Sequence, residues 1–406
     1  MIRALFIALT LVALPAAAAE PPPDPAALLA QQTSEFRFTA DKLEGPGAEI
    51  IDELAAQSQF VLLGEEHMDH LIPVFAGALF RLLHDRHGYR HLVVEQDPVA
   101  IEDALDPARR GDAEKLGAHA KRYPSLFEFD TDEDLELLAM VGRVITGPDA
   151  IWGVEQATGA VRYLEELARL APNANARKAI EKVLAEARIA DAEPKYSVNW
   201  LIAEGTPAAL KSLESEVRGG SDTRAYRLFS GLTKSSEIFG YYRRAEAGEW
   251  VGLFNNTVRE EVLKANFIER YRAAAKREGN PKAMFKFGAN HLYHGKNPTQ
   301  AYPIGNLAHE LAILNGRQAF GIYVLPLGPN YMSYADFPKW MLPLLPAKEP
   351  VVPTLINLRP LRAYQRLFRE KTELADQWMV RDLINGYDAI VLLPESKPAT
   401  RKLGGR

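Results

Sequence analysis

The sequence predicts an α/β fold with a mainly parallel central sheet of about six strands, flanked by helices. Two observations carry this prediction. Short runs of strand-forming apolar residues alternate along the chain with stretches of helical periodicity. Residues 58–96 also contain strand, helix and strand in fewer than 40 residues. A helix that connects two strands in this way crosses back over the sheet, which makes the strands parallel.

Six segments have the composition of strands. They are 58–67, 89–96, 149–156, 282–291, 318–328 and 387–396. Helical periodicity precedes the first of them, at 47–57, and lies between the others at 71–88, 101–145 and 303–314. The run 71–88 ends at Gly88, and glycine is typical of the position that follows a helix.

We expect one α/β domain over residues 36–396, interrupted by a helical insertion at about 160–280 that caps the sheet. The insertion has long amphipathic runs and no strand pattern. Residues 20–35 are rich in proline and predict a flexible lead-in, and residues 397–406 predict a disordered tail. The long segment 326–353 is rich in proline and aromatic residues, which favours the rim of a pocket.

Residues 1–19 have the pattern of a secretory signal peptide. Arg3 precedes an apolar run, and the small residues that follow fit cleavage after Ala19. The run is short for a membrane span, which needs roughly 20 residues. We therefore expect a periplasmic or secreted chain without a stable membrane anchor after cleavage, the alternative being an uncleaved anchor.

Composition excludes several classes of catalysis and of binding partner. The 406 residues include no cysteine, which excludes thiol catalysis and cysteine-bound metals. The formal net charge of -5 gives no electrostatic footprint for nucleic acid, so the expected partner is a small-molecule or peptide substrate. Motifs of serine hydrolases, nucleotide-binding loops and HExxH zinc enzymes are absent from the sequence.

Acidic and histidine side chains follow four of the predicted strands. Glu65 and His67 follow the first, Glu95 the second, Glu155 the third and His291 the fourth. Ligands bind outside the carboxyl ends of parallel strands, so we expect these five side chains to form one site. Carboxylates that face histidines fix the ring orientation and raise the imidazole pKa, which suits a general base or a metal ligand.

Spacing refines this prediction. Glu65 and His67 lie two residues apart on an extended strand end and should point to the same side, with Glu66 on the other. His291 and His294 lie three apart, which on a helical turn places them on one face. His294 and His70 are therefore candidate ligand-binding residues, and the alternative for both is a polar residue at a helix start.

The segment 255–266 adds a candidate helix. Arg259 could clamp a carboxylate, a phosphate or an oxyanion, and Glu260 and Asn266 lie near it as candidate substrate-binding residues. The alternative is an ordinary amphipathic helix.

Together these motifs resemble a known superfamily, which comprises erythromycin esterases, ChaN-like haem-uptake proteins and Tiki proteins. FVLLGEEHMDH is similar to its Gly-Glu-x-His strand end, and VREEVLKANF is similar to its Arg-[Asp/Glu]-x-x-Met-x-x-Asn helix, with Leu263 where methionine is usual. FKFGANHLYHG resembles its late strand, which ends in histidine. The esterase branch separates its first Glu and His by three positions, whereas Glu65 and His67 are separated by two.

The resemblance implies a site at the sheet edge that activates water through a His–Glu pair, binds a divalent metal for hydrolysis, or binds haem. We favour an exported hydrolase that cleaves an ester or an amide. In this hypothesis Glu65 orients His67, and His67 takes a proton from water. Arg259 and His291 stabilise the developing oxyanion, while the two other acidic residues hold the imidazoles or a cation; these are Glu95 and Glu155.

Three alternatives stay open. A divalent Mn, Co, Zn or Fe ion would take its ligands from Glu65, His67, Glu95, Glu155 and His291. A periplasmic haem- or iron-binding protein would use His67 or His291 as an axial ligand, with the stretch 326–345 over the macrocycle. The last alternative is a non-catalytic scaffold for envelope assembly.

Overall fold

The structure is a computed structural model, and it describes residues 22–147, 149–192, 199–217, 223–251, 253–329 and 331–404. The predicted signal peptide and its cleavage site lie outside the described residues. No helix in the described part of the chain is long and apolar enough to cross a membrane.

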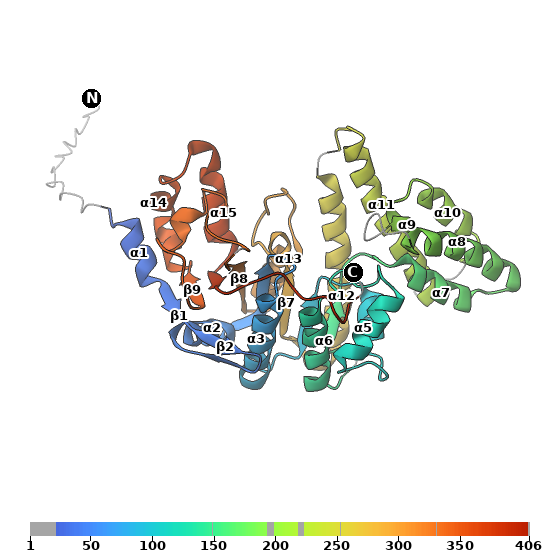
Figure 1. Cartoon of the computed structure of the whole chain (residues 1–406), viewed down its shortest axis with the longest axis horizontal. Helices are drawn as coiled ribbons and strands as arrows, with labels where there is room; N and C mark the ends of the chain where they lie inside the picture. Colours follow the sequence, from blue (N-terminus) through green and yellow to red (C-terminus); the bar gives the residue numbers. More distant parts are fainter. Residues whose placement is uncertain are drawn as a thin grey trace, which may run out of the picture.

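The predicted α/β class is confirmed, with a larger sheet than expected (Figure 1). The main sheet has eight strands in the order β1-β9-β10-β8-β4-β7-β5-β6. All six predicted strands are present and parallel to one another: β4 (Ser58–Glu65), β5 (His91–Val94), β6 (Ile151–Gly153), β7 (Ala283–Gly288), β8 (Gln318–Pro326) and β10 (Ala389–Leu393). The sequence missed β1 (Thr33–Glu35) and β9 (Thr354–Asn357), which pair antiparallel at one edge.

Helices cover both faces of this sheet, so its central strands are buried on both sides. In β4, Val61 and Leu63 pack into the core on one face, and Phe60 and Leu62 pack into the core on the other. The first face is covered by α2 (Pro46–Ala56), α3 (Leu71–His87), α5 (Ala113–Arg122) and α6 (Asp132–Val144). The second is covered by α12 (Phe254–Glu278), α13 (Ile304–Leu314) and α15 (Gln377–Gly386).

The smaller elements complete the fold. They are the hairpin β2 (Arg37–Thr39) and β3 (Lys42–Glu44), the helices α1 (Pro25–Gln31), α4 (Pro98–Ala104) and α14 (Gln365–Arg369), and the 3-10 turns η1 (Ala289–His291), η2 (Leu342–Leu344), η3 (Pro360–Tyr364) and η4 (Leu374–Asp376). Helix α3 ends at Gly88, as the sequence predicted, because that glycine adopts a left-handed φ of 70°.

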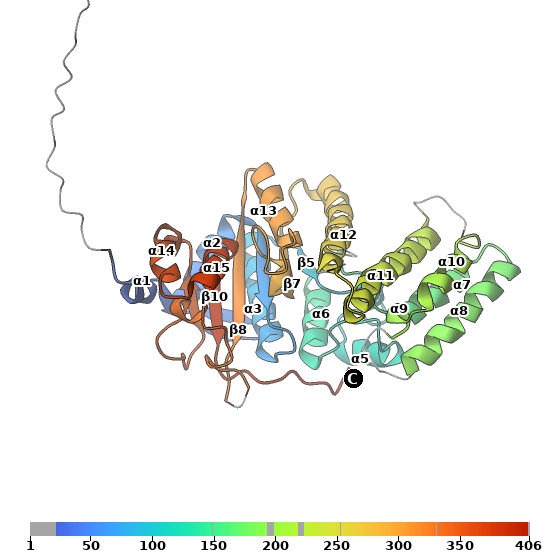
Figure 2. The same cartoon turned by 90° about the horizontal axis from the view of Figure 1, so that it is seen from above.

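The described residues of 160–280 contain helices and no strand. They form α7 (Ala160–Leu170), α8 (Ala174–Ala192), α9 (Asn199–Ile202), α10 (Thr206–Leu213), α11 (Arg224–Glu246) and α12. Figures 1 and 2 show that α7 to α10 extend away from the sheet, at the end of the molecule opposite α1. Within the insertion, α11 and α12 are the helices that line the cavity beside Glu155, which follows β6.

Three local predictions are wrong. The flexible lead-in is ordered from residue 25: Asp24 caps α1, and Thr33–Glu35 joins the sheet by pairing with β9. The tail is ordered over 397–404, which we call the C-terminal segment. The described residues of 326–353 do not line the cavities beside the site, since Phe337 and Met341 pack into the core.

Backbone hydrogen bonds order the C-terminal segment. The Lys397 carbonyl accepts from His70 N at 3.1 Å, and Ala399 N donates to the Met68 carbonyl at 2.7 Å. The Thr400 carbonyl accepts from Asp132 N at 2.8 Å, and the Asp132 carboxylate accepts from Leu403 N at 2.7 Å. The segment therefore joins the loop after β4 to the start of α6, a contact that no local sequence pattern could predict.

Candidate functional site

The five predicted strand-end residues lie together, and Glu95 is at their centre. Its Oε2 lies 3.7 Å from His67 Nε2, and its Oε1 lies 3.3 Å from His291 Nε2. The same carboxylate accepts a 2.6 Å hydrogen bond from Arg259 Nη2 and a 2.7 Å bond from Gly288 N. One carboxylate, 3% exposed, thus connects two imidazoles and a guanidinium.

His67 is held on three sides. Its Nδ1 lies 3.1 Å from Glu65 Oε1, so Glu65 and His67 point to the same side, as their spacing predicted. Glu66 points elsewhere and accepts a 2.6 Å hydrogen bond from the Tyr323 hydroxyl. The ring stacks on Phe129 with centroids 4.3 Å apart, and its side chain is 33% exposed.

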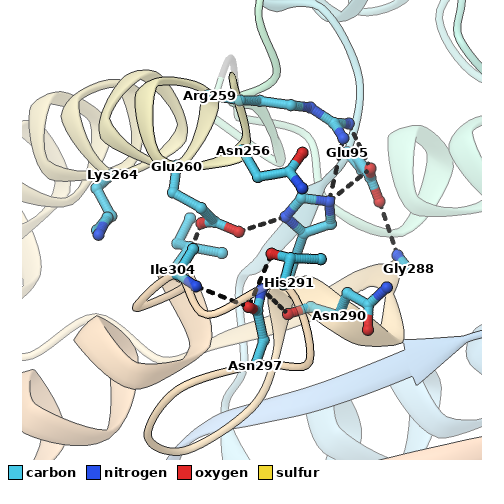
Figure 3. A network of polar contacts seen from close by, with 12 residues as sticks. Glu95, Asn256, Arg259, Glu260, Lys264, Gly288, Asn290, His291, Asn297 and Ile304 are labelled. Atoms are coloured by element: carbon cyan, nitrogen blue, oxygen red, sulfur yellow. Dashed lines mark hydrogen bonds and ion pairs between the residues drawn. The ribbon is translucent and has the colours of Figure 1, made fainter. Parts of the chain in front are cut away.

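His291 is held in the same manner by a second carboxylate (Figure 3). Its Nδ1 lies 2.5 Å from Glu260 Oε1, and Glu260 Oε2 accepts a 2.8 Å hydrogen bond from Ile304 N at the start of α13. Glu260 is 1% exposed, so it positions the histidine. It therefore lacks the access that its predicted substrate-binding role requires.

Arg259 closes the cluster from α12. Its Nε and Nη2 donate to the two oxygens of Glu155 at 2.9 and 2.5 Å, a bidentate pair. Its Nη1 lies 3.2 Å from His291 Nε2. Asn266, further along the same helix, donates to the Val154 carbonyl at 3.0 Å and so ties α12 to the chain after β6.

Sequence reasoning missed a buried lysine beneath the site. Lys286, inside β7, donates at 2.8 Å both to Glu65 Oε1 and to Asp134 Oδ1 of α6. Both the lysine and Glu65 are 5% exposed. The available signal was a single charged residue within the apolar strand AMFKFG.

Charge in the cluster is unbalanced. Four carboxylates bond the two permanent cations Arg259 and Lys286, and a fifth, Glu260, bonds His291. The four are Glu65, Glu95, Glu155 and Asp134. Burial alone would lower the pKa of His67, but Glu95 and Glu65 outweigh it and raise that pKa to about 9. Burial opposes the protonated form of His291 too, and Glu95 again prevails and raises its pKa.

These pKa shifts change the role that we expect for the histidines. His67 is protonated at neutral pH, so it would take a proton from water only above about pH 9. Glu95 stays ionised: burial would raise its pKa, but His291, His67 and Arg259 lower it to about 2. At neutral pH the cluster offers fixed positive charge and N–H donors.

The donors do not fit a metal ion in this arrangement. The guanidinium of Arg259 lies between Glu95 and Glu155, and Lys286 bonds Glu65. In the described part of the chain, no group of three or more histidine and carboxylate side chains could hold a metal ion. A haem ligand fits poorly as well, since both nitrogens of each imidazole already face carboxylates.

Two predicted ligand-binding residues lie outside the cluster. His70 Nδ1 contacts the backbone of Lys397. His294 stacks on His309 with centroids 4.2 Å apart and lines a separate cavity of about 580 Å³. The predicted shared face of His291 and His294 is wrong, because the 3-10 turn ends at His291 and the chain then changes direction.

A cavity of about 270 Å³ opens onto the cluster beneath the α11–α12 pair. Arg259 and Glu155 lie in its wall, together with Glu128, Gln156, Thr158, Ile238, Phe239, Tyr242, Asn255 and Asn256. Glu155 also borders a second cavity of about 430 Å³ between α4, α11 and α12. A small molecule in the first cavity would therefore contact the guanidinium directly.

Comparison with solved structures finds proteins of the same architecture. A histidine-to-asparagine variant of erythromycin esterase EreC, solved in its open conformation, aligns with a TM-score of 0.54 at 16% identity, over 90% of this chain and 98% of its own. The chain shares the erythromycin esterase fold. The resemblance inferred from the motifs is thus confirmed at the level of the fold.

Two further structures are similar. A protein from Bacillus cereus aligns with a TM-score of 0.54 at 12% identity, and a succinoglycan biosynthesis protein with 0.55 at 14%. Each alignment covers 93% of this chain and 98% of the other. No family model and no curated protein matches the chain.

Proposed function

We propose that the protein is an exported hydrolase that cleaves an ester or amide bond in a small-molecule or peptide substrate. One observation carries the proposal: Glu95 holds two oriented imidazoles and a partly buried guanidinium beside a cavity of about 270 Å³. Fixed donors of this kind stabilise the oxyanion that forms when water attacks a carbonyl carbon. Export rests on the signal-peptide pattern of residues 1–19.

The roles follow from the charges. Arg259 reaches the cavity wall and stabilises the developing oxyanion, and His291 supports it from 3.2 Å away. His67 is an imidazolium at neutral pH, so it donates its proton to the leaving oxygen or nitrogen instead of accepting one. The donors do not fit a metal, and we derive no step through one.

Hydrolysis of p-nitrophenyl acetate, phenyl acetate and an amino-acid p-nitroanilide tests the proposal. We expect His67→Gln to lower kcat/KM at least a hundredfold for phenyl acetate, because general acid–base groups typically contribute 10²- to 10⁴-fold. The matched control is His84→Gln, which changes a histidine outside the cluster, in the last turn of α3, and should keep full activity. Full activity of His67→Gln would contradict the proposal.

The pH profile tests the role of His67. If the imidazolium is the acid, activity falls as pH rises through about 9. An increase through the same pH would show instead that the neutral imidazole is the base. Amino-terminal sequencing of the exported chain tests localisation, with Glu20 expected as the first residue.

A further inference from the structure

We infer that Glu128 is the catalytic base of this site, the residue that takes the proton of the attacking water. The inference rests on the proposed hydrolase function and supplies a part that function lacks. His67 is charged at neutral pH, and both ring nitrogens of His291 already have partners, Glu260 on one side and Glu95 and Arg259 on the other. Glu65, Glu95, Glu155 and Glu260 are each bonded to a cation, an imidazole or both. A hydrolase that uses water needs a group free to accept its proton.

Glu128 lies in the segment between α5 and α6 and reaches the same cavity as Arg259 and Glu155. Gln96, directly after β5, fixes this segment in place. Its Oε1 accepts from Glu128 N at 2.9 Å, and its Nε2 donates to the Phe129 carbonyl at 2.9 Å. Since Phe129 stacks on His67, Glu128 is anchored between the end of β5 and the imidazole.

Its carboxylate is the one acid in the cavity wall without a polar partner. Among the hydrogen bonds and ion pairs of the described residues, none involves the Glu128 side chain, whereas Glu155 is fully engaged by Arg259. The side chain is partly buried. It is therefore held at the cavity with both oxygens available to a water molecule.

The surroundings of Glu128 make its carboxylate a stronger base than a solvent-exposed one. Burial raises the pKa of Glu128, and the negative charges of Glu155 and Glu95 raise it further, while Arg259 and His67 oppose the shift. The net direction is upward, which increases the basicity of the carboxylate. These four residues exert the largest electrostatic effects on it.

The proton transfers balance. Glu128 accepts a proton from water as the hydroxyl oxygen bonds to the carbonyl carbon, and Arg259 stabilises the oxyanion. The bond to the leaving oxygen then breaks, and that oxygen takes the proton of the His67 imidazolium. A proton passes from Glu128 to His67 through solvent and restores both groups, so the net reaction consumes one ester and one water and releases one acid and one alcohol.

The test uses p-nitrophenyl acetate and phenyl acetate with the full-length protein and the variants E128Q, E128A and E261Q. Glu261 is exposed on α12 and serves as the matched control. We expect E128Q to lose 10²- to 10⁴-fold in kcat with little change in KM. We also expect the pH profile of E128Q to lose its acid limb, the fall in activity at low pH that protonation of Glu128 causes. Formate should restore the activity of E128A at least tenfold. E261Q should behave as wild type.

Each outcome is decisive. E128Q activity within twofold of wild type would overturn the inference and leave the hydrolase function intact. A loss in E128Q with an unchanged acid limb and no rescue of E128A by formate would show a structural role and overturn it too. If wild type and E261Q hydrolyse neither ester, nor the p-nitroanilide, the proposed function fails and the inference with it. Thermal melting checks folding, and E128Q should be no less stable, because it removes repulsion from Glu155.

Discussion

Replacing Lys286 by methionine should destabilise the protein strongly, and more at neutral than at acidic pH. The lysine lies inside β7 and donates at 2.8 Å to both Glu65 and Asp134. Methionine keeps most of the side-chain volume and removes the charge. Two buried carboxylates then lose their shared cation.

The magnitude follows from burial and from the partners that remain. Breaking a buried ion pair by removing one member costs about 3–5 kcal/mol. Glu65 still faces His67, and Asp134 still accepts from the Thr131 hydroxyl at 2.7 Å, so we expect a loss near the lower end, about 3 kcal/mol. In the wild type, burial would raise the pKa of Glu65 but Lys286 lowers it overall. That stabilisation is present above the unfolded pKa and is lost as pH falls through the folded value.

The Lys286→Met variant reverses this dependence of stability on pH. Without the lysine, burial raises the pKa of Glu65, so the cost of burying its charge is largest near pH 8 and shrinks toward pH 5 as it takes up a proton. Urea unfolding followed by tryptophan fluorescence measures the lost free energy of unfolding at pH 8 and at pH 5. Lys282→Met is the control, since Lys282 Nζ donates to the His87 carbonyl and its loss should cost about 1 kcal/mol or less. A loss under about 1 kcal/mol in Lys286→Met, or a deficit that grows toward acid, would refute the reasoning.

Two further changes test the geometry of the site. In Gly288→Ala the new Cβ would lie 2.5 Å from His67 Nε2 and 3.4 Å from Glu95 Oε2, so the ring must move, and we expect roughly a hundredfold loss of ester hydrolysis; wild-type kinetics would contradict this. Deleting residues 397–406 removes the backbone bonds to Met68 and the start of α6, which should lower the melting temperature and speed hydrogen exchange in the loop that carries His67. Unchanged exchange there would show that the loop is ordered without the C-terminal segment.

The sequence predicted the strands and helices that have a local pattern, and it predicted the grouping of site residues that follows from one topological rule. The buried run 58–67 and the glycine-terminated helix 71–88 were recognised from periodicity, and the structure has them as β4 and α3. The grouping of Glu65, Glu95 and His291 followed from the rule that parallel strands end at one edge.

The rest depended on contacts between distant segments. Strand β1 has three residues and a polar composition, and its partner β9 follows more than 300 positions later, so neither has a local signature. Lys286 and Glu128 resemble solvent-facing charges in sequence, although Lys286 interrupts an apolar strand and Glu128 stands between Phe127 and Phe129. What each does is set by its neighbours, which only the folded chain brings together.

The C-terminal segment has a consequence for when the site forms during synthesis. The loop that carries His67 accepts and donates its backbone hydrogen bonds to residues 397–399, and His70 and Lys397 are 327 positions apart. At about 5–20 residues per second, a ribosome needs roughly 15 to 65 seconds to travel that distance. Throughout this interval the strand ends exist without the segment that fixes their loop. A nascent chain of this protein therefore carries its histidines long before it has a finished site.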